Sequence, residues 1–509
     1  MSNQLTRRRL LASVGGLAGL ALGGTAGAVP SRVESVDELP VRWNRTYAPN
    51  SVNNAVRALE RDGQYVGFGA TGGQAGETTG WLFGIDATTS EGQWQTRVEN
   101  PEFDSQPSFQ IPQTTRLAEA PDGEGFAILG VRLVEGSVSL VRTGPEGTVD
   151  WWESFSAEAD DGSDAALIPT SLVTVDDGYV LGGYTDAGET ASAVVLKIGP
   201  DGTEQSRTRL FEDERSAMLD ATPDGEGGVV AAGQLQEATT ASQDQPQVRV
   251  VLFRLDADLS VQWNREFTPE ADGTTFQTTR PRAITSTADG YAVVGTAAPE
   301  EGTGVSGWFL RTDESGAGQV NRLVEPAEST SLTGVVDASD GLTVAGQVAE
   351  SSGAQSAAGW VAELDEDGAG RWTKEFSRES LNNFTDLLAT SDDGIAAVGT
   401  VQAGSQDADP LSQAWVVKLG GEPAPSVTSM PGEDTPTPMT TPTDTPEPTP
   451  TRTPAPTPTP TPMTTPTQTP TATGTPTDTT SGSGPGFGVV GTLTALGIGA
   501  LSRRLSREE

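Results

Sequence analysis

One short pattern recurs along the middle of the chain and constrains the fold more than any other feature. Within each copy, an Asp-Gly pair precedes an apolar, glycine-containing run, and a second apolar run follows. The pairs are Asp62-Gly63, Asp122-Gly123, Asp177-Gly178, Asp224-Gly225, Asp289-Gly290, Asp340-Gly341 and Asp393-Gly394. Glycine adopts positive φ at no steric cost, so these pairs mark tight turns between strands. Such self-similarity predicts a repeat architecture built from β-strands.

Each unit contains four predicted strands. The first precedes the Asp-Gly turn, as at residues 283–287, and the two apolar runs are the second and third. The fourth carries a tryptophan and an aromatic residue four positions later. Its clearest copies are Trp151 with Phe155, Trp263 with Phe267, and Trp372 with Phe376. Aromatic and β-branched residues between Gly, Pro and Asp are typical of strands.

The two ends of the array are complementary. The last unit stops after its third strand, at Leu419, whereas the array begins with an isolated fourth strand at residues 43–47. An open stack would leave both edges unpaired, and a closed ring removes them. We therefore predict an all-β domain at residues 29–420, a seven-bladed β-propeller whose N-terminal strand completes the last blade. A linear β array or two sandwiches is the alternative.

Composition excludes several classes of function. The chain has 70 acidic and 31 basic residues, a net charge of −39, and neither cysteine nor histidine. Disulfides, thiol catalysis and Cys- or His-ligated metals are excluded, and nucleic acid, which requires a basic surface, is not an expected partner. Acid-rich, lysine-poor composition resembles that of haloarchaeal proteins. We expect no cofactor.

Residues 1–28 have the pattern of an export signal. Three arginines, Arg7, Arg8 and Arg9, precede an apolar run that ends in small residues at Ala28. This arrangement predicts cleavage before Val29. The segment Thr6 to Leu11 resembles the twin-arginine motif, which implies export of the folded protein, with Arg7 and Arg8 as the paired arginines. A general secretory signal with a chance arginine run is the alternative.

The C-terminal part changes composition abruptly. Residues 421–484 are rich in Thr and Pro, which predicts a disordered, extended stalk suited to O-glycosylation. Residues 485–509 contain Pro485-Gly486-Phe487, a short apolar run and arginines. This order resembles the PGF-CTERM sorting signal of archaeal surface proteins. The resemblance implies cleavage by an archaeosortase and attachment to a membrane lipid. A retained short transmembrane helix is the alternative.

The repeats themselves resemble those of secreted propellers in archaeal and bacterial surface proteins. The shared pattern runs from the Asp-Gly turn through the apolar strands to the tryptophan and phenylalanine of the closing strand, over residues 43–419. The resemblance implies a cell-surface protein with a propeller fold. Propellers carry many unrelated functions, so it implies no activity.

Three features are candidate sites. The turn Asp365-Glu366-Asp367-Gly368 has carboxylates that suit calcium, but the equivalent turns vary, and we expect a hairpin turn. The periodic tryptophans are expected to pack between blades and not to form a sugar platform. Asn44 and Asn383 begin N-glycosylation sequons, both expected in the closing blade.

These observations favour a cell-surface binding or adhesion module for a protein or glycan ligand, without catalytic chemistry. The alternative is an extracellular polysaccharide hydrolase or lyase that uses paired carboxylates. Ligand contacts are expected on the face that carries the long, variable loops between second and third strands and between blades. Phe103, Phe109 and Phe276 are its candidate exposed aromatics.

Overall fold

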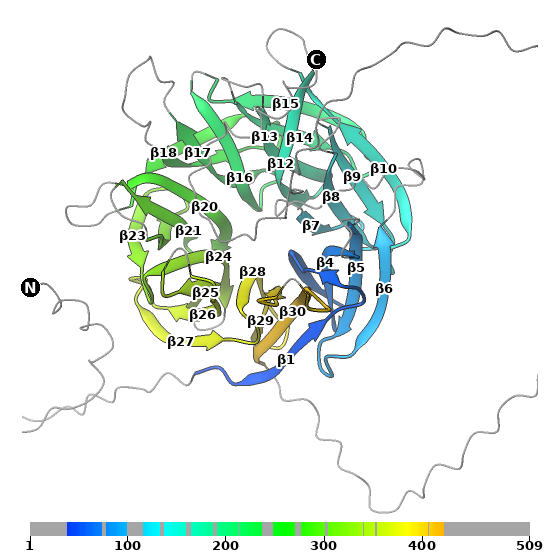
Figure 1. Ribbon diagram of the computed structural model, residues 1–509. Coiled ribbons are helices and arrows are strands. Elements are labelled where there is room, and N and C mark those ends of the chain that lie inside the picture. The colour runs from blue at the N-terminus through cyan, green and yellow to red at the C-terminus, as the bar shows by residue number, and fades with distance from the viewer. Residues whose placement is uncertain are drawn as a thin grey trace, which may run out of the picture. The chain divides into compact units, whose positions relative to one another are not determined.

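The protein forms a ring of seven four-stranded antiparallel blades (Figure 1). The computed structural model describes residues 38–73, 78–98, 116–132, 137–158, 164–186, 191–212, 214–236, 248–269, 276–300, 304–338, 341–351, 354–405 and 407–421. Blades 1 to 6 consist of β3–β6, β7–β10, β12–β15, β16–β19, β20–β23 and β24–β27, and blade 7 of β28–β30 with β1. The predicted seven-bladed propeller is confirmed.

The first strand of each blade lies innermost. These strands are β3 (Arg57–Arg61), β7 (Arg116–Glu119), β12 (Asp164–Val175), β16 (Arg215–Pro223), β20 (Phe276–Thr287), β24 (Ser329–Ala338) and β28 (Leu381–Ala389). Each contacts the innermost strand of the next blade, and β28 contacts β3. The innermost strands therefore surround one axis at the centre of the ring (Figure 1).

The middle strands are the most apolar. The second strands are β4 (Gln64–Gly72), β8 (Phe126–Arg132), β13 (Gly178–Asp186), β17 (Val229–Gln236), β21 (Gly290–Pro299), β25 (Gly341–Ala349) and β29 (Gly394–Gln402). The third strands are β5 (Thr78–Asp86), β9 (Ser137–Thr143), β14 (Ala193–Ile198), β18 (Val248–Leu255), β22 (Ser306–Asp313), β26 (Ala358–Leu364) and β30 (Ser412–Gly420). They are covered on both faces by neighbouring blades, which explains their near-continuous apolar sequence.

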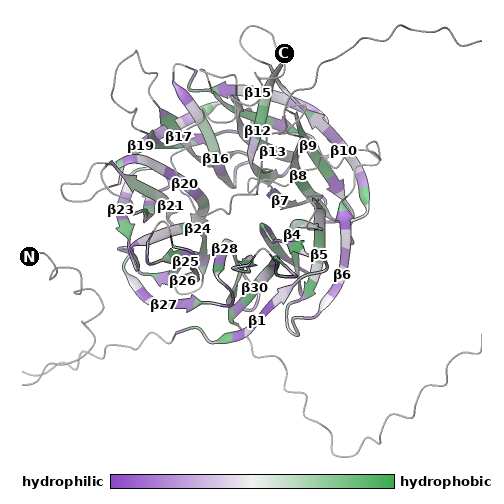
Figure 2. Ribbon diagram, in the orientation of Figure 1, coloured by the Kyte–Doolittle hydropathy of each residue, from purple (hydrophilic) through white to green (hydrophobic). Residues whose placement is uncertain are grey.

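The outermost strands are the most exposed, with mainly exposed and partly buried residues. They are β1 (Val41–Tyr47), β6 (Gly92–Val98), β10 (Val149–Phe155), β15 (Glu204–Leu210), β19 (Val261–Phe267), β23 (Gly318–Val324) and β27 (Gly370–Phe376). Figure 2 shows hydrophobic residues on the middle strands and a mixture on this rim. Two short strands, β2 (Val52–Asn53) and β11 (Ala157–Glu158), pair at the blade ends.

Closure of the ring joins the two ends of the described chain. β1 pairs antiparallel with β30, with Asn44 opposite Val417 and Tyr47 opposite Ala414. The order of blade 7 is therefore β1-β30-β29-β28. The prediction that the isolated strand at residues 43–47 completes the last blade is confirmed.

The hydrophobic core is divided among the blade interfaces. Seven clusters of buried residues occur in the described ranges, and each joins two adjacent blades. The cluster between blades 7 and 1 contains Val416 and Phe83, so this interface is packed like the others. Because the core is interfacial, stability depends on every blade having both neighbours.

The tryptophans of the outer strands pack between blades, as predicted. Trp43, Trp151 and Trp263 contact Tyr65, Tyr179 and Tyr291 of the following blade, with ring centroids 5.9, 6.5 and 6.3 Å apart. The three pairs occupy equivalent positions in the repeat. No helix in the described part of the chain is long and apolar enough to cross a membrane.

Candidate functional site

One position of the innermost strand recurs around the centre of the ring. In every blade it pairs with the equivalent residue of the second strand. From blade 1 to blade 7 its residues are Arg57, Arg116, Ser171, Asp220, Ala283, Gly334 and Asp386. Four blades (1, 2, 4 and 7) have a charged residue at this position, and the other three (3, 5 and 6) have a small one. The large side chains therefore have room to meet at the centre.

Ion pairs at this position connect both neighbouring blades and blades on opposite sides of the axis. Arg57 Nη1 lies 2.6 Å from Asp386 Oδ1, and Arg57 Nη2 lies 3.9 Å from Asp220 Oδ1. Arg116 Nε lies 3.6 Å from the same oxygen of Asp220. Because Asp220 is in blade 4 and the arginines are in blades 1 and 2, these side chains meet across the axis. Their side chains are only 11 to 14% exposed.

The two aspartates are also tied to the backbone. Asp386 Oδ2 accepts a hydrogen bond from the amide of Ala58 at 3.0 Å, and Asp220 Oδ2 accepts one from the amide of Ile284 at 3.1 Å. Each bond runs to the innermost strand of the following blade. An arginine and a backbone amide therefore hold each carboxylate in a fixed orientation.

Two further arginines of β20 face the same centre. Arg282 is the extra residue of a bulge between Pro281 and Ala283, and Arg280 pairs with Thr296. Burial, then the nearby charges of Arg280 and Arg116, lower the pKa of Arg282 to about 9. Arg116 is in blade 2 and Arg282 in blade 5, so these guanidinium groups approach one another across the axis. We call Arg57, Arg116, Asp220, Arg280, Arg282 and Asp386 the axial cluster.

The bulge of blade 5 departs from the pattern of the other blades. In blades 3, 6 and 7 the bulged residue is a threonine whose hydroxyl donates to a carbonyl of the next blade. Those threonines are Thr170, Thr333 and Thr385, with bonds of 2.5, 2.7 and 3.0 Å. Arg282 replaces this hydroxyl with a charged group that makes no such bond. Blade 5 therefore carries a cation at a position where blades 3, 6 and 7 have a hydroxyl.

The pKa values in the axial cluster reflect unequal pairing. Burial disfavours the charged form of Arg57, but Asp386 and Asp220 outweigh it and raise the pKa of Arg57. Burial and the charge of Arg57 lower the pKa of Arg116 to about 9, despite Asp220. Burial also lowers the pKa of Arg280. All four remain cations at neutral pH. Among the described residues, Arg280 and Arg282 have no acidic partner.

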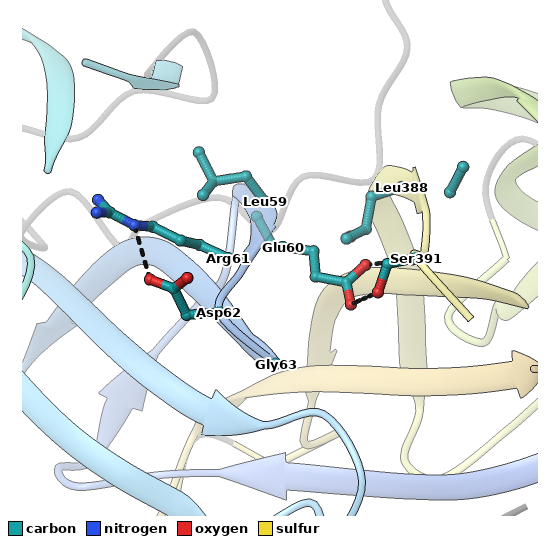
Figure 3. A pocket seen from close by; sticks show the side chains of 9 residues that line it. Leu59, Glu60, Arg61, Asp62, Gly63, Leu388 and Ser391 are labelled. Carbon is teal, nitrogen blue, oxygen red and sulfur yellow. Dashed lines mark hydrogen bonds and ion pairs between the residues drawn. The ribbon is translucent and has the colours of Figure 1, made fainter. Parts of the chain in front are cut away.

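A pocket of about 440 Å³ lies between β3 and β28 on the face with the Asp-Gly turns (Figure 3). Glu60 Oε2 accepts from the amide of Ser391 at 2.6 Å, and Glu60 Oε1 accepts from its hydroxyl at 2.7 Å. Arg61 contacts Asp62 at 3.2 Å, and its guanidinium lies 5.6 Å from the ring centroid of Phe126. The charged side chains of this pocket already have partners within the protein. The axial cluster is therefore the better candidate for a ligand-binding site.

The candidate aromatics of the long-loop face have different outcomes. Phe103 and Phe109 lie outside the described residues. The expectation that Phe276 is exposed is wrong, because it begins β20 and is only 9% exposed, in the core between blades 4 and 5. A parallel bridge between Val248 and Thr278 holds this end of β20 against blade 4.

The sequons lie in the closing blade, as predicted, on β1 and β28. Asn44 Oδ1 accepts from Trp415 Nε1 and from Arg378 Nε, both at 2.8 Å, so this side chain has a structural role. Asn383 is a partly exposed strand residue opposite Thr400. The export and sorting residues Arg7, Arg8, Ala28, Pro485, Gly486 and Phe487 lie outside the described residues.

The acidic turn at Asp365 is a hairpin, as expected. Asp365 Oδ1 accepts from the amides of Asp367 and Ala369 at 3.0 and 2.7 Å, and the amide of Gly368 donates to the Asp365 carbonyl at 2.9 Å. The carboxylate thus closes its own turn. Within the described ranges, no group of three or more acidic residues is placed to hold a metal ion.

The comparisons with known proteins give fold-level likeness. No family model and no curated protein matches the sequence. Among solved structures, the Dos1 propeller is 9% identical, with a TM-score of 0.43 and coverage of 74% of this chain and 95% of that one. Quinohemoprotein alcohol dehydrogenase from Comamonas testosteroni is 10% identical, with a TM-score of 0.41 and coverage of 76% and 77%. The β-propeller domain of the Trilobed protease from Pyrococcus furiosus is 7% identical, with a TM-score of 0.38 and coverage of 68% and 91%.

Proposed function

We propose that this protein is a binding or adhesion module held at the outer face of an archaeal cell envelope. The axial cluster is the observation that carries the proposal. Its two carboxylates, Asp220 and Asp386, are each engaged by an arginine and a backbone amide. A carboxylate-dependent hydrolase or lyase requires an acid that is free to contact its substrate, and both of these carboxylates are occupied by donors of the protein itself. The arrangement supports binding over catalysis.

The closed ring also supports the binding proposal, because it is a rigid scaffold. Seven packed interfaces and the β1–β30 pairing hold the strands of all seven blades in one rigid scaffold. Binding residues are concentrated on variable loops carried by such scaffolds. We therefore place the ligand for cell-surface binding on the long-loop face. Phe103 and Phe109 are candidate ligand contacts on that face, whereas Phe276 is buried in the core and is not.

Envelope attachment rests on the sequence of the two ends. The twin-arginine-like segment at residues 6–11 would direct export of an already folded ring. The Thr/Pro-rich stalk would hold the ring away from the membrane, since an extended chain spans about 3.1 Å per residue. We infer removal of residues 1–28 and cleavage near Pro485-Gly486-Phe487, with lipid attachment. Mass spectrometry of the membrane-bound protein tests this inference, because an intact peptide that contains Leu501 would contradict the cleavage.

Polysaccharide from the envelope of the producing cells provides the test of function. The purified full-length protein is expected to bind this polysaccharide, or intact cells, without generating new reducing ends or unsaturated sugars. Replacement of residues 237–247 by a Gly/Ser segment of equal length should reduce binding. The control variant Asp367→Asn, in a tight turn on the other face, should not. Release of sugar products would favour the hydrolase or lyase, and absence of retention by either material would overturn the binding proposal.

A further inference from the structure

We propose that the axial cluster is a binding site for a small dianionic oxyanion, with Arg280 and Arg282 as its principal cations. Its ligand class comprises sulfate, hydrogen phosphate and small dicarboxylates. This inference goes beyond the proposed function, because it holds whether or not the protein is attached to a cell surface. It concerns the centre of the ring and not the long-loop face.

The charge balance determines how many negative charges the site needs. Arg57 and Arg116 contact Asp386 and Asp220 at 2.6 to 3.9 Å. Arg280 and Arg282 make no hydrogen bond or ion pair with any residue that the structure describes, and the Nε of each is buried without a partner. These two guanidinium groups together carry a charge of +2, which one dianion would neutralise.

The cost of the unpaired arginines points in the same direction. Burying a cation without a partner is costly, and like charges nearby add to the cost. Burial lowers the pKa of Arg280, and burial followed by the charges of Arg280 and Arg116 lowers the pKa of Arg282, which is consistent with this cost. An oxyanion among them would supply the missing acceptors, and guanidinium groups bind carboxylate, phosphate and sulfate oxygens through paired hydrogen bonds.

The surroundings make this basic group unusual for the chain. The whole protein carries a net charge of −39, and blades 3 and 6 place small residues, Ser171 and Gly334, at the axial position. Arg282 occupies a bulge where three other blades have threonine. Arg280 and Arg282 are both partly exposed residues. A small ion from solvent can therefore reach them, and their buried Nε atoms have no acceptor within the described part of the protein.

The test uses the full-length protein, titrated with sodium sulfate, sodium phosphate and sodium succinate against sodium chloride at constant ionic strength. Calorimetric titration is expected to show saturable binding of at least one of the three dianions, with a matching rise in Tm. Arg282→Gln and Arg280→Gln should each weaken Kd by on the order of ten- to a hundredfold, the usual effect of removing a charged hydrogen-bond donor. The matched control, Arg265→Gln, removes an exposed guanidinium from β19 and should leave Kd unchanged.

Sulfate also stabilises proteins by exclusion from their surfaces, so the difference between variants carries the result. A rise in Tm that is equal in wild type, Arg282→Gln and Arg265→Gln would overturn the site. Equal binding of chloride would overturn the assignment to a dianion. Neither variant should unfold in the absence of dianions, because neither side chain loses a partner there. Failure of cell-surface binding, with dianion binding intact, would contradict only the proposed function.

Discussion

The indole of Trp415 donates a hydrogen bond to Asn44 Oδ1 at 2.8 Å, joining two residues 371 positions apart in the chain. Trp308 donates in the same way to Asn321 Oδ1 at 2.8 Å, within the covalently continuous blade 5. The closing blade thus repeats the third-to-fourth-strand contact of an ordinary blade. The N-terminal strand is an integral part of the fold and not an accessory.

Removal of β1 should therefore destabilise the entire ring. A variant that lacks residues 1–50 exposes the edge of β30 and loses the bonds of Asn44 and the packing of Trp43 against Tyr65. We expect a large fall in Tm and aggregation, because an unpaired apolar edge strand recruits other chains. Calorimetry and light scattering measure both effects. A variant that lacks only residues 1–38 is the control, and equal melting of the two truncated proteins would contradict closure by β1.

The outer-strand tryptophans predict a steric effect at one turn glycine. Gly316 has φ +77°, and a Cβ there would lie 2.6 Å from Trp263 Cζ3. Gly63 has a similar φ of +74° with nothing within 4 Å of that Cβ. Gly63→Ala should cost about 1 kcal/mol from backbone conformation alone. Gly316→Ala should cost about 1 to 3 kcal/mol more, because the indole must move. Denaturant unfolding tests this difference, and equal losses would show that Trp263 yields freely.

The fold could be predicted from the sequence because its signals are local and repeated. Asp62-Gly63 and its copies form tight turns, and Trp151 and Trp263 recur where adjacent blades must pack. Closure followed from counting strands, since only a ring uses all of them. A single unit would not have sufficed, but seven copies with consistent spacing exclude most other arrangements.

The axial cluster could not be predicted in this way. Arg57, Arg116, Asp220 and Asp386 are far apart in sequence and meet only because the ring places the same strand position of each blade around one axis. Bulges in the innermost strands shift this position by one residue. The regular alternation of side chains along a strand therefore predicts the wrong residue at the centre of the ring. Phe276 illustrates the opposite error. Its polar neighbours suggested a loop, whereas the residue begins a buried strand.

A buried ion pair in the closing blade should make stability depend on pH. Lys418 Nζ lies 2.5 Å from Asp392 Oδ1 and 2.5 Å from Thr390 Oγ1, and Lys418 is 2% exposed. Burial tends to raise the pKa of Asp392, but hydrogen bonds from Lys418 and Thr390 outweigh it, so the pKa is lowered. A carboxyl whose pKa is lower in the folded state stabilises the fold above the unfolded pKa, about 4. This contribution is lost as the pH falls through the folded pKa.

Asp392→Asn should therefore lower Tm near pH 7 and have progressively less effect as the pH falls below about 4. The adjacent Asp393→Asn is the matched control, because Asp393 is exposed and its positive φ of 59° suits asparagine. Thermal unfolding from pH 2 to 8 measures both variants against wild type. A loss from Asp392→Asn that is constant over this range would mean that packing, and not the charge, is responsible.

The ion pairs of the axial cluster predict the largest effect of a single charge removal. Arg57→Met leaves Asp386, which is 12% exposed, with only the amide of Ala58 and weakens the pairing of Asp220. Removing one partner of a buried pair typically costs about 3 to 5 kcal/mol. Molar salt should not remove this loss, because buried pairs are poorly screened. Adding Asp386→Asn should recover part of the stability, since the amide oxygen still accepts from Ala58 and no longer carries a charge. Denaturant unfolding of wild type, both single variants and the double variant measures the coupling energy between the two residues. Surface substitutions usually change the free energy of unfolding by no more than about 0.5 kcal/mol. A loss of that size for Arg57→Met would show that the cluster does not hold the centre of the ring together.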